Sequence, residues 1–237
     1  MPSVQDHVVA VVRLPAEGPP SSALEIVGTA FFLDGDGTFL TASSSFSEPK
    51  PGTRLGLAVR LADRHAPVSL VPIAVHEFAD PPWEIAIGRA EVATQSPFTW
   101  AGRSAASLLW ERVHAYGCVA WEPADGTHHA RAAYRSSEGN VLEERAAERG
   151  LQAPELHLSF GIPAHYRGAP LFLHERPRAK LIGICVGNGG LGLLRFPLRS
   201  AGTFEVRNDV YGIAQDLRDA GAWKPQLLQG RSLRDFL

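Results

Sequence analysis

Cysteine is scarce in this sequence. Cys118 and Cys185 are the only two among 237 residues, and each stands in a short apolar run, AYGCVAW and LIGICVGN. Small secreted domains that rely on disulfides carry a much denser cysteine framework. The sequence therefore predicts two reduced, buried thiols, with a single structural disulfide as the alternative.

Long apolar runs and an excess of basic charge are also missing. No stretch approaches the roughly 18 apolar residues of a membrane-spanning helix, and residues 1–20 contain no apolar run of signal-peptide length. We therefore expect a cytoplasmic protein that does not contact a membrane. The 23 Lys and Arg are spread along the chain against 25 Asp and Glu, which argues against a nucleic acid partner.

What the sequence does contain is many short apolar segments separated by turns. It has 23 Gly and 18 Pro, and the segments between them are rich in Val, Ile, Leu and Phe, as short β-strands are. The expected strands form two sets on either side of a looser stretch near 95–107. The first set is 7–14, 28–35, 38–43, 54–62, 68–78 and 83–91, and the second is 111–121, 127–136, 155–162, 169–174, 180–187 and 210–215.

Two sets of six strands predict an all-β chain with two antiparallel barrels or sandwiches in sequence. We place the first at 1–107 and the second at 108–222, followed by a C-terminal tail at 223–237. The tail is expected to pack back on the body of the protein, with docking elsewhere as the alternative.

Signals for helices are few. The run EGNVLEERAAERG (138–150) predicts a short helix, and YGIAQDLRDAG (211–221) predicts a strand that passes into a helix ended by Gly221. The glycine-rich run at 187–192 lacks the Lys-Ser/Thr pair of a phosphate-binding loop. We expect it to be a flexible loop between strands.

Three segments match, in order, the motifs of one protein family. The first starts with Gly-Thr-x-Phe and ends in Leu-Thr-Ala, the second contains Ile-Ala-Ile, and the third contains Gly-Ala-Pro-Leu and precedes Leu-Ile-Gly-Ile. The segments are VGTAFFLDGDGTFLTASSSF (27–46), WEIAIGRAE (83–91) and SFGIPAHYRGAPLF (159–172). RVHAYGCVAW (112–121) also looks like the strand that opens the second barrel of that family. The chain thus resembles the trypsin-like serine proteases, of chymotrypsin fold, over most of residues 8–217.

The resemblance implies a fold of two six-stranded antiparallel barrels, but it breaks at the catalytic positions. Ser44 stands where the family has its histidine, Glu84 where it has its aspartate, and Arg167 where it has the nucleophilic serine. In the oxyanion loop Gly168 is kept, whereas the glycine two residues before the nucleophile is replaced by His165.

These replacements decide the chemistry that the resemblance implies. Arg167 stays protonated and is not a nucleophile at neutral pH. The hydroxyl of Ser44 cannot take and return a proton near neutral pH, as the base of the family must. His165 makes the backbone geometry of an oxyanion hole costlier than glycine does. We therefore expect a degenerate homologue that is not an enzyme and has no catalytic residues.

An arginine in the cleft between two barrels is costly to desolvate unless it is paired. The nearest acidic residue by alignment is Glu84. We expect an Arg167–Glu84 ion pair in the free protein, with an acidic group of a binding partner as the alternative.

Without catalysis, the resemblance implies a protein-binding or regulatory module with a protein or peptide partner. The edge strand that can pair with an extended peptide comprises Cys185, Val186, Gly187 and Asn188. Trypsin-like domains without signal peptides occur in bacterial multi-protein systems, including defence-associated ones, and the resemblance is compatible with that setting.

Two other functions stay open. One is a structural assembly subunit that uses its outer faces and its tail. The other is a serine hydrolase with a rearranged active site, in which a histidine activates a serine at a position outside the family pattern. The residues available for it are His76, His165, His174 and Ser43–Ser45.

Neither a metal nor another cofactor is expected. His128 and His129 are adjacent, so on a strand their side chains would point in opposite directions. His114 and His157 add no second pair at ligand spacing. A solvated loop accounts for the adjacent pair.

Overall fold

The structure, a computed structural model, describes most of the chain. The described residues are 4, 7–17, 24–46, 50–59, 68–93, 99–100, 107–122, 131–148, 152–175, 178–190, 194–197, 204–207 and 210–236. Within these ranges strands dominate, and no helix there is long and apolar enough to cross a membrane.

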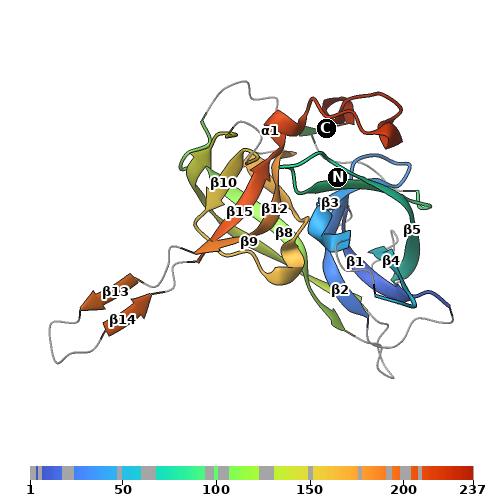
Figure 1. Ribbon diagram of the computed structural model, residues 1–237, viewed down its shortest axis with the longest axis horizontal. Helices are drawn as coiled ribbons and strands as arrows, with labels where there is room; N and C mark the ends of the chain where they lie inside the picture. Colours follow the sequence, from blue (N-terminus) through green and yellow to red (C-terminus); the bar gives the residue numbers. More distant parts are fainter. Residues whose placement is uncertain are drawn as a thin grey trace.

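The first six strands close into an antiparallel barrel in the order β1-β2-β3-β6-β5-β4 (Figure 1). Their bounds are β1 Val8–Pro15, β2 Glu25–Phe32, β3 Thr38–Ala42, β4 Thr53–Val59, β5 Ser69–Phe78 and β6 Ile85–Ala90. Apart from Arg13, strand β1 is apolar without alternation because both of its faces are buried. Val9 and Val11 pack inside this barrel, whereas Ala10 and Val12 pack against Cys118 of the second one.

The second barrel is built from later strands in the order β11-β8-β9-β10-β15-β12, and the pairing of β11 with β12 closes it. Their bounds are β8 Arg112–Glu122, β9 Arg131–Arg145, β10 Glu155–Leu158, β11 Pro170–Glu175, β12 Arg178–Gly190 and β15 Val210–Asp216. The short β7 (Thr99–Trp100) adds to β12 in parallel. The predicted fold, all-β with two six-stranded antiparallel barrels of chymotrypsin type, is confirmed.

Two predictions about local structure were wrong. The run from 138 onward is not a helix, because β9 continues to Arg145 and pairs with β8 on one side and β10 on the other. Residues 149 and 150 of the predicted helix lie outside the described part. The first four residues of the glycine run, Gly187–Gly190, form a strand and not a loop, because β12 pairs with β15 through them. Ladder hydrogen bonds between backbones need no side chains, so tertiary pairing prevails over local propensity in both cases.

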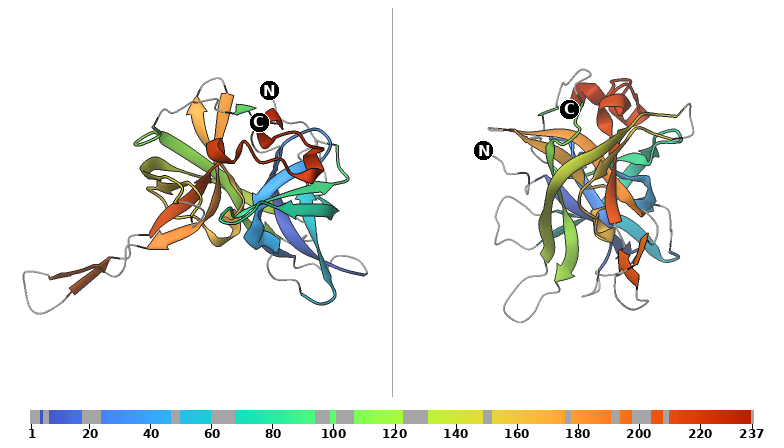
Figure 2. Two further views of the ribbon diagram at one scale, coloured as in Figure 1. Left: turned by 45° about the horizontal axis from the view of Figure 1, so that its top comes forward. Right: turned by 90° about the vertical axis from the view of Figure 1, so that its left-hand side faces the viewer.

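A hairpin that was not predicted stands apart from both barrels. It consists of β13 (Leu194–Pro197) and β14 (Phe204–Arg207), which pair only with each other among the described strands. Figures 1 and 2 show it projecting from the end of the second barrel.

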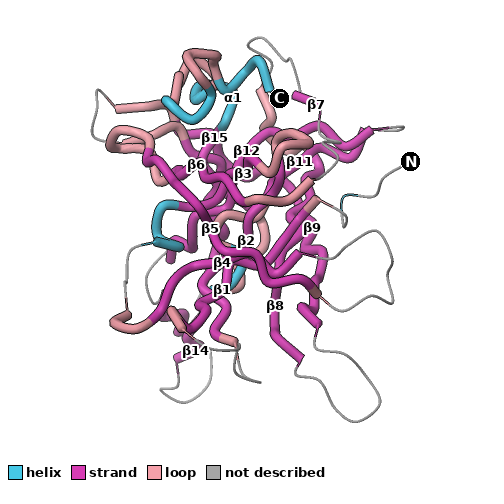
Figure 3. Tube along the Cα trace, turned by 90° about the vertical axis from the view of Figure 1, so that its right-hand side faces the viewer, coloured by secondary structure: helices cyan, strands magenta, loops and turns pink. Residues whose placement is uncertain are grey.

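The chain ends in short helices that lie together at one end of the molecule (Figure 3). Strand β15 passes into α1 (Leu217–Ala220), which ends at Gly221, as the sequence predicts. The tail contains η4 (Gln226–Leu228) and η5 (Leu233–Phe236). Leu228 and Leu233 are buried in a cluster with side chains of β6, so the tail packs back on the first barrel.

Candidate functional site

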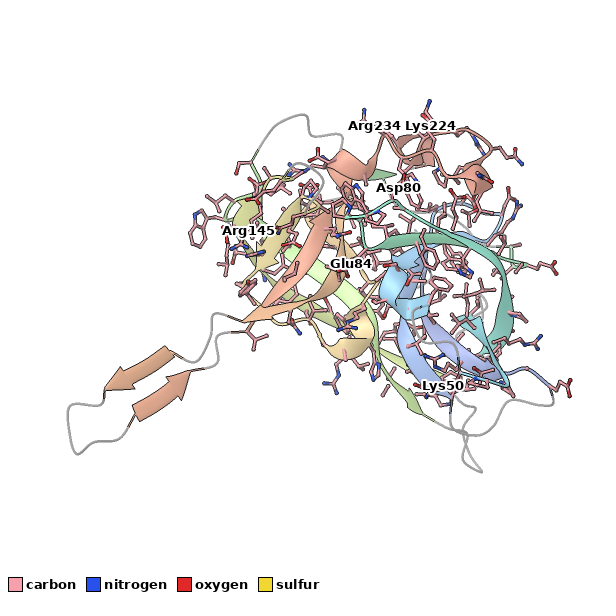
Figure 4. The ribbon with its side chains drawn as sticks, viewed as in Figure 1. Lys50, Asp80, Glu84, Arg145, Lys224 and Arg234 are labelled. Carbon is pink, nitrogen blue, oxygen red and sulfur yellow. The ribbon has the colours of Figure 1, made fainter. Side chains whose placement is uncertain are left out.

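Segments from both barrels meet at the positions that the resemblance singles out. The turn η2 (Ser43–Phe46) follows β3, and its first N–H donates to the Glu84 carbonyl at 3.0 Å. From the second barrel, the Arg167 carbonyl accepts a hydrogen bond from the Thr29 N–H of β2 at 2.8 Å. Both contacts lie where the barrels adjoin. Figure 4 shows Glu84 between the two barrels.

Gly168 holds the barrels together at this point. Its φ of +87° is in the left-handed region, and a Cβ there would collide with the Thr29 carbonyl oxygen and lie 2.7 Å from the Ala42 nitrogen. Its N–H donates to the Cys185 carbonyl at 2.7 Å. Only glycine satisfies both the backbone angle and the close approach. The loop that carries Arg167, which the resemblance aligns with the nucleophile loop of the family, is thereby set directly against the end of β3.

Thr29 fixes the conformation of that loop from the first barrel. Residues Ala164–Tyr166 form one turn of 3₁₀-helix, η3, which is closed by the Tyr166 N–H donating to the Pro163 carbonyl at 2.8 Å. The buried Thr29 hydroxyl donates to the His165 carbonyl at 2.7 Å and accepts from the Cys118 N–H at 3.0 Å. Thr29 therefore holds two carbonyls of the loop, that of His165 with its buried hydroxyl and that of Arg167 with its backbone N–H.

Tyr166 belongs to the same loop and holds it to the second barrel through its buried side chain. Sequence analysis did not predict this role. The side chain is fully buried, and a Cβ on Gly117 would lie 2.7 Å from its ring. Its hydroxyl donates to the Arg135 carbonyl at 2.5 Å, and burial raises its pKa above the ordinary value. The sequence feature that could have indicated this contact is Gly117 of β8, which faces the Tyr166 ring, but no local pattern pairs the two positions.

Side chains of the protein itself fill the space between the Ile162 segment and strands β12 and β15. Ile162 is buried, and a Cβ on Gly212 would lie 2.8 Å from its side chain. The Asn188 carboxamide closes the same space: its oxygen accepts from the Ile162 N–H at 2.6 Å, and its nitrogen donates to the Ile162 carbonyl at 2.7 Å. Asn188 therefore ties the Ile162 segment to β12.

Comparison with known proteins gives a fold and no family. No family model matches the chain, and no curated protein matches it. Among solved structures, it is similar to a variant of the HtrA-type protease AlgW with a decapeptide, at a TM-score of 0.56 and 14% identity over 92% of this chain and 62% of that one. AlgW itself with a decapeptide has a TM-score of 0.55 and 12% identity, over 90% of this chain and 61% of that one. The variant with a tripeptide has a TM-score of 0.55 and 15% identity, over 91% of this chain and 57% of that one.

The fold is that of a trypsin-like protease. The chain spans less than two thirds of the length of each of these AlgW chains. At 12 to 15% identity the likeness is one of architecture. It extends over both barrels of this chain.

The expected ion pair between Arg167 and Glu84 was wrong. Both residues are exposed, and among the described residues no salt bridge joins them. The Glu84 N–H instead donates to the side chain of Gln215 at 2.9 Å, and Gln215 is buried. A guanidinium that reaches water keeps its hydration and needs no internal partner, which removes the physical basis of the expectation.

The predicted peptide edge is only partly available. The Cys185 N–H donates to the Ala169 carbonyl at 2.9 Å, and its carbonyl accepts from Gly168, so this residue pairs within the protein. Farther along, Gly187–Gly190 pair with β15 through one edge. The other edge of β12 faces the Ile162 segment, where Asn188 uses its side chain rather than its backbone.

Two of the residues considered for a rearranged hydrolase, His76 and Ser45, contact other side chains. His76 stacks on Phe46 with ring centroids 4.2 Å apart, and burial lowers its pKa. The Ser45 and Thr41 hydroxyls are hydrogen-bonded at 3.2 Å. The side chain of His174 lies outside the described residues. Neither contact places a histidine on a serine.

Metal ligands do not cluster in the described residues. His157 is buried between two carboxylates, 3.1 Å from Glu143 and 3.4 Å from Glu155, and stacks on Tyr211. His114 lies 3.5 Å from Glu138. His128 and His129 lie outside the described part of the chain.

Both thiols are buried and free, as the sequence predicts, and no disulfide joins them. Burial is the main cause of a raised pKa for each: that of Cys118 is about 12, and that of Cys185 is raised as well. Neither is therefore a thiolate that could act as a nucleophile at neutral pH.

Proposed function

We propose that the chain is a catalytically inactive homologue of trypsin-like proteases that acts as a protein-binding or regulatory module. The observation that carries the proposal is the content of the site. Arg167 stands where the fold needs a nucleophile, and Ser44 stands where it needs a base. A guanidinium and a hydroxyl cannot perform the proton transfer and nucleophilic attack on which acyl transfer depends.

The geometry of the nucleophile loop supports the same proposal. An oxyanion hole needs backbone N–H groups that point at the developing negative charge. By the resemblance these would be the N–H groups of His165 and Arg167, and His165 lies inside the η3 turn (Ala164–Tyr166) where the family has a glycine. In the trypsin-like template a specificity pocket adjoins the nucleophile, and we infer that Ile162 and Asn188, which are hydrogen-bonded to each other, occupy the corresponding place in this chain.

We infer that the partner binds as an extended peptide along the outer edge of β12, at Gly187–Gly190. Glycine weakens a strand interior and is found there where another backbone approaches closely. Among the described residues, a Cβ on Gly187 or Gly190 would meet nothing within 4 Å, so internal crowding does not require glycine. Edge pairing would supply affinity through main-chain hydrogen bonds. The similar AlgW structures hold a decapeptide or a tripeptide.

The setting that we propose for this module is a cytoplasmic multi-protein assembly. Two buried free thiols and no disulfide are typical of proteins from a reducing compartment. The spread of basic residues along the chain favours a protein or peptide partner over nucleic acid.

Fluorophosphonate labelling tests the loss of catalysis. The intact chain and Arg167→Ser should both stay unlabelled, because no base stands at position 44. An active trypsin-type protease treated in parallel is the positive control. Stoichiometric labelling of any serine, lost when the protein is first denatured, would show a working site and overturn the inactive assignment.

Binding is tested separately by following the backbone amides of Gly187–Gly190 while a random library of unstructured peptides is screened. The selected peptides should shift these amides and leave those of β1 unchanged. If selected peptides bind only at other surfaces, or if none binds, the edge is not the peptide site. An assembly subunit would then be favoured.

A further inference from the structure

The turn that leads into β8 holds a tryptophan in a backbone conformation that suits glycine. Trp110 has φ of +66°, and the turn is closed by the Glu111 N–H donating to the Leu108 carbonyl at 2.8 Å. The Trp110 N–H donates to the Val141 carbonyl at 2.8 Å, and its carbonyl accepts from the Asn140 side chain at 2.9 Å. For a bulky residue this conformation is an outlier that surrounding contacts must maintain.

Among the described residues, burial of the indole does not compensate for this strain. Trp110 is 67% exposed, and Leu109 of the same turn and Leu142 of the adjoining β9 are 45% and 39% exposed. A glycine would fit the backbone better and expose less apolar surface. A strained, exposed aromatic side chain flanked by two leucines has the character of a binding anchor, because such residues dominate interface energies.

Along β9, one ion pair precedes and another follows the point where Trp110 is bonded to Val141. Arg112 and Glu138 form an exposed ion pair at 2.9 Å, and Arg145 and Glu143 form another at 3.1 Å. Figure 4 shows Arg145 on the side of the second barrel remote from Glu84. We call Leu109, Trp110 and Leu142 with these two ion pairs the tryptophan patch. It is separate from the β12 edge.

We propose that the tryptophan patch binds a second copy of this chain about a two-fold axis. In such an interface the same surface is used twice and must be complementary to itself. An apolar centre with one arginine and one glutamate on each side meets this requirement, since each arginine can face a glutamate of the partner. The balanced charge does not favour a strongly basic or acidic partner or an anionic membrane surface. The two β12 edges of the dimer would give a bivalent module.

Sedimentation velocity of the intact chain, from about 1 µM to about 100 µM, tests this proposal. The wild type should pass from monomer to dimer within this range. Trp110→Gly should weaken dimerisation at least about thirtyfold while the thermal midpoint stays the same or rises, because the strain is relieved. Phe78→Ser is the matched control: Phe78 is 49% exposed on the first barrel, and its replacement should leave the dimer intact.

Charge reversal distinguishes a specific two-fold interface from general apolar association. Arg112→Glu should weaken the dimer, and the double variant Arg112→Glu with Glu138→Arg should restore it, because in the proposed dimer Arg112 of one copy faces Glu138 of the other. A wild type that stays monomeric at the highest concentration overturns the proposal. So does a dimer that Trp110→Gly leaves unchanged, or one that Phe78→Ser abolishes equally.

Discussion

The side-chain amide of Asn188 forms hydrogen bonds with both backbone groups of Ile162, at 2.6 and 2.7 Å. A residue in extended conformation offers its N–H and C=O on the same side to a neighbouring strand. The Asn188 carboxamide therefore takes the place of the peptide group of a partner strand. It keeps the backbone of the Ile162 segment satisfied where no strand is paired with it.

Replacing Asn188 should expose these two groups. In Asn188→Ala, we expect the Ile162 amide hydrogen to exchange faster with solvent and the free energy of unfolding to fall by about 1 to 2 kcal/mol. Peptides that pair with the β12 edge should bind the variant more tightly, because the side chain no longer has to be displaced. Hydrogen exchange followed by NMR measures the first effect and titration the second.

Asn140→Ala is the control for this prediction, because it also removes an asparagine bonded to a backbone carbonyl, that of Trp110. It should leave the exchange rate at Ile162 unchanged. If Asn188→Ala does not accelerate exchange there, the two hydrogen bonds do not persist in solution.

Thr29 should be one of the most sensitive hydroxyl positions in the chain. Thr29→Val keeps the shape of the side chain but removes the bond to the His165 carbonyl and the acceptor for the Cys118 N–H. Because both partners are then left without this bond in a buried region, we expect a loss of roughly 2 to 4 kcal/mol in unfolding free energy. Urea denaturation measures it.

Thr53→Val is the matched control. The Thr53 hydroxyl also donates to a backbone carbonyl, that of Lys50 at 2.7 Å, but on an exposed turn. Water can replace that bond, so the loss should stay below about 0.5 kcal/mol. Equal losses at Thr29 and Thr53 would show that the loop does not depend on the buried hydroxyl.

The architecture could be predicted from the sequence, because burial on both faces of strands such as β1 leaves uninterrupted apolar runs between turn residues. The position of the site followed from motif order. Its contents did not: Tyr166, Asn188 and Thr29 act through partners between 26 and 136 residues away, and no local pattern pairs them. The Arg167–Glu84 pair was wrong because the sequence does not reveal that both side chains reach solvent.

Gly168 should not tolerate even a methyl group. In Gly168→Ala the added Cβ would meet backbone atoms of β2 and β3, which cannot move without opening the first barrel. We expect a loss of more than about 3 kcal/mol in unfolding free energy, or failure to fold.

Gly52 separates the steric cause from the backbone-angle cause, because its φ is +72° and a Cβ there would meet nothing within 4 Å. Gly52→Ala should cost only about 1 kcal/mol, and similar losses at both positions would rule out the steric explanation.

The buried thiols should make the protein less stable as the solution becomes alkaline. The pKa of Cys118 is raised by burial from 9.0 to about 12, so between these values the folded protein keeps a proton that the unfolded chain releases. Its contribution to the free energy of unfolding is therefore complete below pH 9 and is lost as the pH rises toward 12, at a slope of up to about 1.4 kcal/mol per pH unit.

Other groups also titrate in this range, so the informative quantity is the difference in slope between the wild type and Cys118→Ala, measured by urea denaturation between about pH 8 and pH 10.5. The variant should show a shallower decline even if it is less stable throughout. Parallel slopes would mean that the thiol ionises equally well in the folded protein, and native-state modification by a thiolate-specific reagent at pH 9 would then be rapid rather than slow.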